Sequence, residues 1–84
     1  MEIDVFIESN NKKIGIEIQC SKPNSIDLRK KIINLDNYCD KWFICVKSRD
    51  YKEYSHISSN KGEIITFAQI IKKLEQLTSS ISLN

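Results

Sequence analysis

The chain has 84 residues, which is enough for one small domain with a single core and too short for two. Apolar residues make up 40% and charged residues 29% of the sequence, which excludes a disordered or fibrous chain. The formal net charge of +2 excludes the strongly cationic balance that identifies a nucleic-acid-binding protein from charge alone.

The cysteines and the apolar runs bear on the cellular compartment. Cys20, Cys39 and Cys45 are odd in number, lack C-x-x-C spacing and lie in or beside apolar runs. They therefore predict buried, reduced thiols rather than disulfides or a zinc site. No apolar run approaches the roughly 18 residues that span a bilayer, and the chain begins MEID, unlike a signal peptide. We expect a cytoplasmic protein with no membrane partner.

Two short segments near the start of the chain predict a β-hairpin. Residues 2–8 and residues 13–20 alternate between apolar and polar side chains, the pattern of strands with one buried face. Asn10 and Asn11 lie between them, and asparagine tolerates the positive φ angles of tight hairpin turns. This turn predicts three apolar pairs across the hairpin: Ile3 with Ile18, Val5 with Ile16, and Ile7 with Ile14.

A helix is predicted to follow the hairpin. Pro23 cannot occupy an ordinary ladder position, and Asn24 or Ser25 can cap a helix with Asp27 in its first turn. An apolar stripe at helical spacing is expected to pack on the sheet: Leu28, Ile32, Leu35 and Cys39. Three basic residues are expected to lie away from that stripe: Arg29, Lys30 and Lys31.

The second half of the chain predicts two more strands. Residues 42–46 form a continuous apolar run, which favours a central strand with Trp42 and Phe43 in the core. A polar loop and a weak strand candidate at 54–58 precede a strand at 63–67.

A last helix is predicted after these strands. Thr66 and Gln69 form its T-x-x-Q capping box. Its buried stripe is expected to comprise Ile70, Ile71, Leu74 and Leu77, and residues 79–84 are expected to be a frayed tail.

These elements predict a single α/β domain over residues 1–84. The order is hairpin, crossover helix, central strand, further strand and C-terminal helix. Two strands joined by a helix favour at least one parallel pair, so the sheet is expected to be small and mixed.

The predicted register places two carboxylates side by side. Asp4 falls opposite Glu17, Glu2 opposite Gln19, and Glu8 opposite Lys13. Opposed Cβ atoms lie about 4.5–5.5 Å apart, and like charges at that distance destabilise a sheet. A cation such as Mg²⁺, which binds through one or two carboxylates and several waters, would explain the pair. The alternative is that Asp4, Glu17 and Gln19 form the solvent-facing side of the hairpin.

At these residues the sequence resembles the PD-(D/E)XK nucleases, which include restriction endonucleases and archaeal Holliday junction resolvases. The resemblance covers residues 2–47 and rests on Asp4, the run Glu17-Ile18-Gln19, and the helix and strand that follow. It implies that Asp4 and Glu17 ligate Mg²⁺ or Mn²⁺, with the carbonyl of Ile18 as a further ligand. It also implies that the residue at the position of Gln19 orients the attacking water.

The sequence departs from the family pattern in three places. Ile3 replaces a proline, and Gln19 replaces a lysine. Glutamine can orient a water but carries no charge, so Lys22 is a hypothetical source of the missing cation. The usual N-terminal helix and first strand do not precede the hairpin. We therefore expect a minimal core, a piece of a longer protein, or a homodimer.

Other residues are weaker candidates for contacts with DNA. A basic rim near the carboxylates that contacts phosphates, or merely a solvated surface, is predicted from Lys12, Lys13, Lys22, Arg29, Lys30 and Lys31. Tyr51 and Tyr54 lie among basic residues and belong either to a stacking surface or to an ordinary loop. His56 is a lone histidine without an identifiable partner.

The sequence therefore predicts a metal-dependent endo- or exodeoxyribonuclease that acts on duplex or branched DNA. One alternative is a catalytically degenerate nuclease fold that binds nucleic acid or a protein. Another is an oligomerisation domain of a larger protein.

Overall fold

A computed structural model of the protein describes residues 3–22 and 24–82, with side chains as far as Leu77. Strands β1 (Val5–Ser9) and β2 (Lys12–Ile18) form the antiparallel hairpin. Asn10 and Asn11 turn the chain with φ angles of 52° and 65°. The register pairs Val5 with Ile16 and Ile7 with Ile14, which confirms the predicted hairpin.

The sheet has four strands in the order β1-β2-β3-β4. Strand β3 (Lys41–Val46) is central and pairs in parallel with both β2 and β4 (Gly62–Thr66). The predicted mixed sheet and central strand are therefore confirmed.

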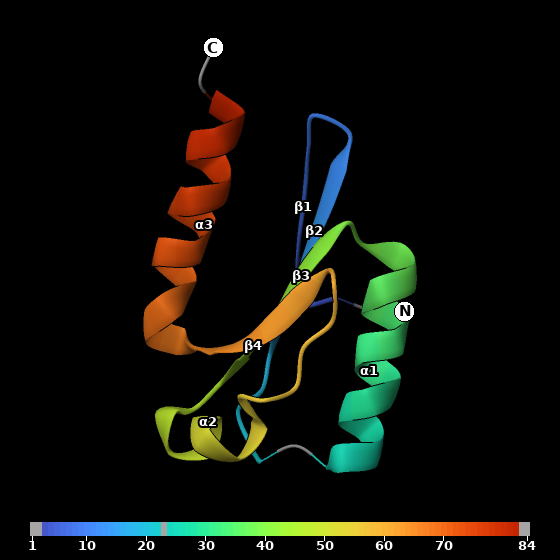
Figure 1. Ribbon diagram of the computed structural model, residues 1–84, viewed down its shortest axis with the longest axis vertical. Coiled ribbons are helices and arrows are strands. Elements are labelled where there is room, and N and C mark those ends of the chain that lie inside the picture. The colour runs from blue at the N-terminus through green and yellow to red at the C-terminus, as the bar shows by residue number, and fades with distance from the viewer. Residues whose placement is uncertain (1–2, 23, 83–84) are drawn as a thin grey trace.

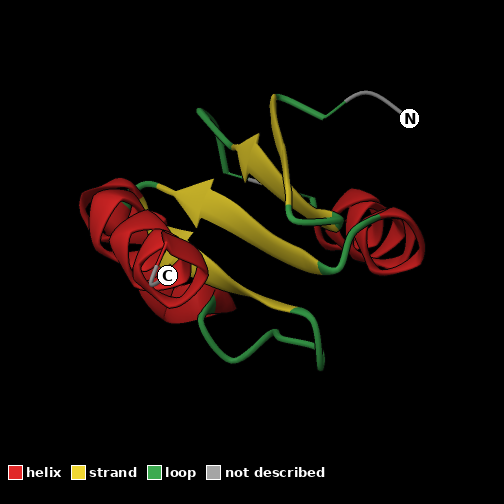
Figure 2. Ribbon diagram, turned by 90° about the horizontal axis from the view of Figure 1, so that it is seen from above, coloured by secondary structure: helices red, strands yellow, loops and turns green. Residues whose placement is uncertain are grey.

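Helices cover both faces of the sheet, so the molecule has three layers. Helix α1 (Ser25–Tyr38) and helix α3 (Phe67–Ser82) lie on opposite sides of the strands (Figures 1 and 2). Side chains of α1 and of the short helix α2 (Ser48–Tyr54) share one core cluster: Leu28, Leu35, Cys39, Trp42, Ile44, Val46, Tyr54 and Ile64. A second cluster lies under α3: Ile16, Phe43, Cys45 and Ile65. None of the helices within the described residues has the length and apolarity of a transmembrane segment.

The predicted caps are confirmed. The Asn24 side chain accepts hydrogen bonds from the backbone N–H groups of Ile26 and Asp27 at the start of α1. Before α3, Gln69 Oε1 accepts from the Thr66 N–H at 2.9 Å. Capping side chains satisfy N–H groups that have no partner inside the helix.

Gly15 brings α1 close to the sheet. A Cβ atom on Gly15 would lie 2.7 Å from Cys39 Sγ and 3.2 Å from Leu35 Cδ2. The lack of a side chain therefore allows the end of α1 to pack directly on β2. The predicted α1 stripe is confirmed, with Leu28, Leu35 and Cys39 buried and Ile32 partly buried.

The structure corrects the interpretation of the segment between β3 and β4. Residues 48–54 form α2 instead of a loop, and the strand candidate at 54–58 is wrong because only Ser58 makes an isolated bridge, to Glu63. Tyr51 and Tyr54 lie three residues apart and point from one side of α2 into the core, where Tyr54 is buried. Because Tyr54 is buried, it cannot belong to a surface on which nucleobases stack.

Four further expectations about side chains or element ends differ from the structure. The Ile3–Ile18 pair is wrong, because the chain bends at Asp4 and Ile3 packs on the α1 side of the sheet. Ile71 is exposed on α3, whereas Ile70 packs inward. Cys20 is exposed, while Cys39 and Cys45 are buried. Helix α3 continues to Ser82, and residues 83–84 of the expected tail lie outside the described residues.

Candidate functional site

The candidate site lies at the edge of the sheet where the parallel strands end. Because β2, β3 and β4 run in the same direction, their carboxyl ends meet at one edge, the usual ligand site of open α/β sheets. Asp4 lies at the same edge, because β1 starts where the antiparallel β2 ends. The loop from β2 to α1 then places the first turns of α1 beside it.

Glu17 is the most unusual residue at this edge. It faces α1 and is 4% exposed, the only buried polar or charged side chain among the described residues. Its Oε1 lies 3.4 Å from Lys31 Nζ, and its Oε2 accepts a 3.3 Å hydrogen bond from the Asp4 N–H. A buried carboxylate costs stability unless an opposite charge and hydrogen bonds compensate it, and Lys31 supplies that charge.

Asp4 in turn binds the backbone of β2 through its side chain. Its side chain is exposed, and its Oδ2 accepts a 2.8 Å hydrogen bond from the Ile18 N–H. The two carboxylates thus continue the hairpin beyond the pair of Val5 and Ile16, each binding the backbone of the other strand. Asp4 and Glu17 are adjacent, as the register predicts.

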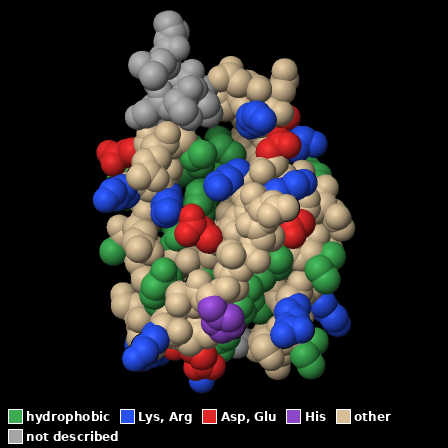
Figure 3. All heavy atoms as spheres, in the orientation of Figure 1, with side chains coloured by type: hydrophobic (Ala, Val, Ile, Leu, Met, Phe, Trp, Pro, Cys, Tyr) green, Lys and Arg blue, Asp and Glu red, His purple; other side chains and the backbone are tan. Residues whose placement is uncertain are grey.

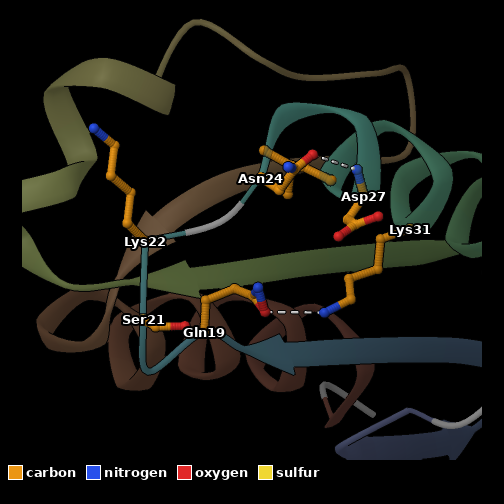
Figure 4. A pocket seen from close by; sticks show the side chains of 7 residues that line it. Gln19, Ser21, Lys22, Asn24, Asp27 and Lys31 are labelled. Carbon is orange, nitrogen blue, oxygen red and sulfur yellow. Dashed lines mark hydrogen bonds between the residues drawn. The ribbon is translucent and has the colours of Figure 1, made fainter.

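Lys31 connects the buried carboxylate to Gln19. Its Nζ donates a 2.9 Å hydrogen bond to Gln19 Oε1 (Figure 4). Together with the ion pair to Glu17, this bond makes Lys31 a neighbour of both polar residues at the end of β2. The prediction that Lys31 lies with the outward basic residues is wrong. Lys31 is three residues from Leu28 and four from Leu35, and this spacing places it beside the buried stripe. That spacing could have shown that Lys31 lies near the sheet, but it does not specify its partners Glu17 and Gln19.

Lys22 lies near the same edge, but its ammonium group is directed toward α2. Its Nζ pairs with Glu53 Oε1 of α2 at 3.0 Å, with both side chains exposed. The hydrogen bond and charge of Glu53 raise the pKa of Lys22. In Figure 4 the Lys22 side chain points away from Gln19 and Lys31. The structure therefore brings Lys31, and not Lys22, to the position beside Gln19.

A small pocket opens next to this pair. Its volume is about 280 Å³, below the usual range of about 300–1,000 Å³ for small-molecule sites. Besides Gln19 and Lys31, the residues that line it are Ser21, Lys22, Asn24, Asp27 and Leu28. The pocket is polar, and both ends of the β2–α1 loop contribute to it (Figure 4).

The basic rim predicted near the carboxylates is dispersed, although its member Lys31 does contact Glu17. Lys12 and Lys13 lie at the opposite end of β2 from Glu17, and Glu8 faces Lys13 across the hairpin as predicted. Arg29 lines a different pocket together with His56, and Lys30 is exposed on α1. Lys and Arg side chains are interspersed with Asp and Glu on the face shown in Figure 3. The predicted position of Glu2 opposite Gln19 lies outside the described residues.

The donor set at the site suits a hard cation. Among the described residues no three His, Cys, Asp or Glu side chains are grouped as metal ligands. Asp4 and Glu17 are neighbours through the hydrogen bonds that their carboxylates accept from the N–H groups of Ile18 and Asp4. Mg²⁺ binds proteins through one or two carboxylates and retains several waters, which fits this pair. Lys31 already contacts Glu17 Oε1, so a cation would share that carboxylate with an ammonium group.

Comparison with protein-family models, curated proteins and solved structures found no match for this chain. The arrangement of Asp4, Glu17, Gln19 and Lys31 within a small mixed α/β domain is therefore the basis for assigning a function.

Proposed function

We propose that this protein is a Mg²⁺- or Mn²⁺-dependent nuclease of the PD-(D/E)XK type that hydrolyses phosphodiester bonds of DNA in the cytoplasm. The observation that carries the proposal is the buried carboxylate of Glu17 beside Asp4 at the carboxyl edge of the sheet. A buried acid next to a second acid costs a fold stability, and a functional role for the pair would explain why the fold keeps it.

In this proposal Asp4 and Glu17 hold the cation together with the backbone carbonyl of Ile18. The bound cation would polarise the scissile phosphate and lower the pKa of a coordinated water. Asp4 is exposed and faces the solvent from which a substrate approaches, whereas Glu17 is fixed by burial.

Lys31 supplies the positive charge that the glutamine at position 19 lacks. Its ammonium group lies 2.9 Å from Gln19 Oε1, so a cation stands beside the amide although it comes from α1. The hydrogen bond occupies the amide oxygen of Gln19 and leaves the N–H₂ group to orient a water or a phosphate oxygen. Lys31 would stabilise charge that develops there during hydrolysis.

The test is cleavage of labelled single-stranded, duplex and four-way-junction DNA with and without Mg²⁺ or Mn²⁺. We expect Asp4→Asn and Glu17→Gln each to lower the cleavage rate at least 100-fold, and Lys31→Met to lower it about tenfold or more. Lys72→Met is the control, because Lys72 is exposed on α3 and does not line the pocket beside Gln19 and Lys31. Full activity in both acid variants, or no cleavage by the parent under any condition, would overturn the proposal.

A second candidate is a degenerate nuclease fold that binds nucleic acid or a protein without cutting. It is favoured by the Glu17–Lys31 pair, which neutralises the buried acid without a metal. Ile26 and Ile33, exposed and seven residues apart on one side of α1, favour a protein contact, including oligomerisation. This candidate predicts no metal-dependent cleavage and, if the ligand is DNA, salt-sensitive binding. A homodimer, which would offer one site to each strand of a duplex, stays a prediction.

A further inference from the structure

Two exposed aromatic rings and a lysine lie together on the α1 side of the hairpin. Phe6 on β1 is 39% exposed, and Tyr38 at the end of α1 is 53% exposed. Their ring centroids lie 5.6 Å apart, with the ring planes inclined by 42°. Lys13 Nζ lies 5.0 Å from the centroid of the Tyr38 ring. We call Phe6, Tyr38 and Lys13 the aromatic shelf.

The backbone holds this shelf in place. Phe6 is opposite Gly15, whose missing side chain lets the end of α1 approach β2 and brings Tyr38 over the hairpin. The Lys13 N–H donates to Asp40 Oδ2 at 2.8 Å, and the Asp40 N–H donates to the Lys13 carbonyl at 2.7 Å. A shelf that is ordered before binding loses little conformational entropy when a ligand arrives.

The shelf continues the candidate site in one direction. Phe6 follows Asp4 by two residues, which separates their Cα atoms by at most about 7 Å. Tyr38 follows Lys31 by seven residues, or about 10 Å along the same side of α1. At a rise of about 3.4 Å per nucleotide, these distances equal two or three nucleotides of a duplex and fewer of an extended strand.

We propose that the aromatic shelf is a stacking subsite for an unpaired nucleobase of a single strand close to the phosphate that is cut. The position of that phosphate rests on the proposed nuclease function. Bases stack on aromatic side chains regardless of sequence, whereas bases inside a duplex are already stacked on one another. Lys13 would contact a neighbouring phosphate, although Glu8 and Asp40 beside it offset part of its charge, so the stacking carries most of the affinity.

The experiment measures binding in EDTA, so that no cleavage is needed. Fluorescence anisotropy compares a labelled oligothymidylate, an abasic strand of the same length and a duplex. We expect the parent to bind oligothymidylate about tenfold more tightly than the abasic strand. The substitutions Phe6→Leu and Tyr38→Leu should each remove most of that preference. Phe67→Leu is the matched control, because Phe67 on α3 is also 39% exposed.

Several outcomes would overturn the proposal that the aromatic shelf stacks a nucleobase. These are equal affinity of the parent for oligothymidylate and the abasic strand, tighter binding of the duplex, no binding at all, or a preference unchanged in both shelf variants. The comparison of strands in the parent does not depend on whether a variant folds. A base preference that requires the shelf, in a protein that cuts no DNA, would support this inference and reject the nuclease function. If the parent cleaves DNA, Asp4→Asn abolishes that cleavage, and the parent shows no base preference, the nuclease function would be supported and the stacking subsite rejected.

Discussion

Removing the ammonium group of Lys31 should destabilise the domain by an amount that the burial of Glu17 determines. Glu17 is 4% exposed, and its side chain faces Lys31 at 3.4 Å. Loss of one partner from a fully buried pair costs about 3–5 kcal/mol. The Lys31 side chain is 32% exposed, and solvent screens part of the interaction, so we expect about 2 kcal/mol for Lys31→Met. In a domain of this size that is roughly 8–16 °C in Tm.

The assay is urea unfolding followed by the fluorescence of Trp42, which is completely buried in the folded state. The double variant Glu17→Gln/Lys31→Met removes both charges and should recover at least half of the loss. Lys22→Met is the control, since the Lys22–Glu53 pair is shorter, at 3.0 Å, but exposed. We expect that control to leave the urea midpoint unchanged, because solvent screens an exposed pair.

The same variants report on cation binding. Without Lys31, the carboxylates of Asp4 and Glu17 should bind a divalent cation better, because no ammonium group competes for Glu17. Mg²⁺ at tenfold above its Kd would add about 1.4 kcal/mol to the stability of Lys31→Met, relative to NaCl of equal ionic strength. Parental stability in Lys31→Met, or a double variant no more stable than it, would refute the reasoning about the buried pair.

Two further predictions concern the packing of α1 and the thiols. Gly15→Ala should lower the free energy of unfolding by about 1–3 kcal/mol, because its Cβ would overlap Cys39 Sγ; an unchanged urea midpoint would contradict the close approach of α1. Alkylation at pH 8 followed by mass spectrometry should label Cys20 alone in the folded protein. Burial raises the pKa of Cys45 to about 11 and also raises that of Cys39, so both stay protonated; labelling of either at the rate of Cys20 would refute this.

Much of the fold was predictable because its signals are local. The two asparagines of the hairpin turn and the side chains at the helix starts act on backbone groups within a few residues. The hairpin register follows from that turn and from alternating isoleucines, so the adjacency of Asp4 and Glu17 was also predictable. Helix α2 was missed because its seven residues are mostly polar, as in a surface loop. Its only inward side chains are two tyrosines, which are too few to show a helical apolar pattern.

The sequence by itself thus determined the hairpin, the caps and the pairing of two acids at one edge of a sheet. Only the tertiary structure decided which lysine contacts Glu17 and Gln19. Lys22 is nearer to Gln19 in the chain, but it pairs with Glu53 on α2. Lys31 reaches Gln19 and Glu17 because Gly15 lets α1 pack closely on β2. Burial of Glu17 has the same origin, since a helix that covers a strand face removes water from it, and no local pattern specifies where that helix lies.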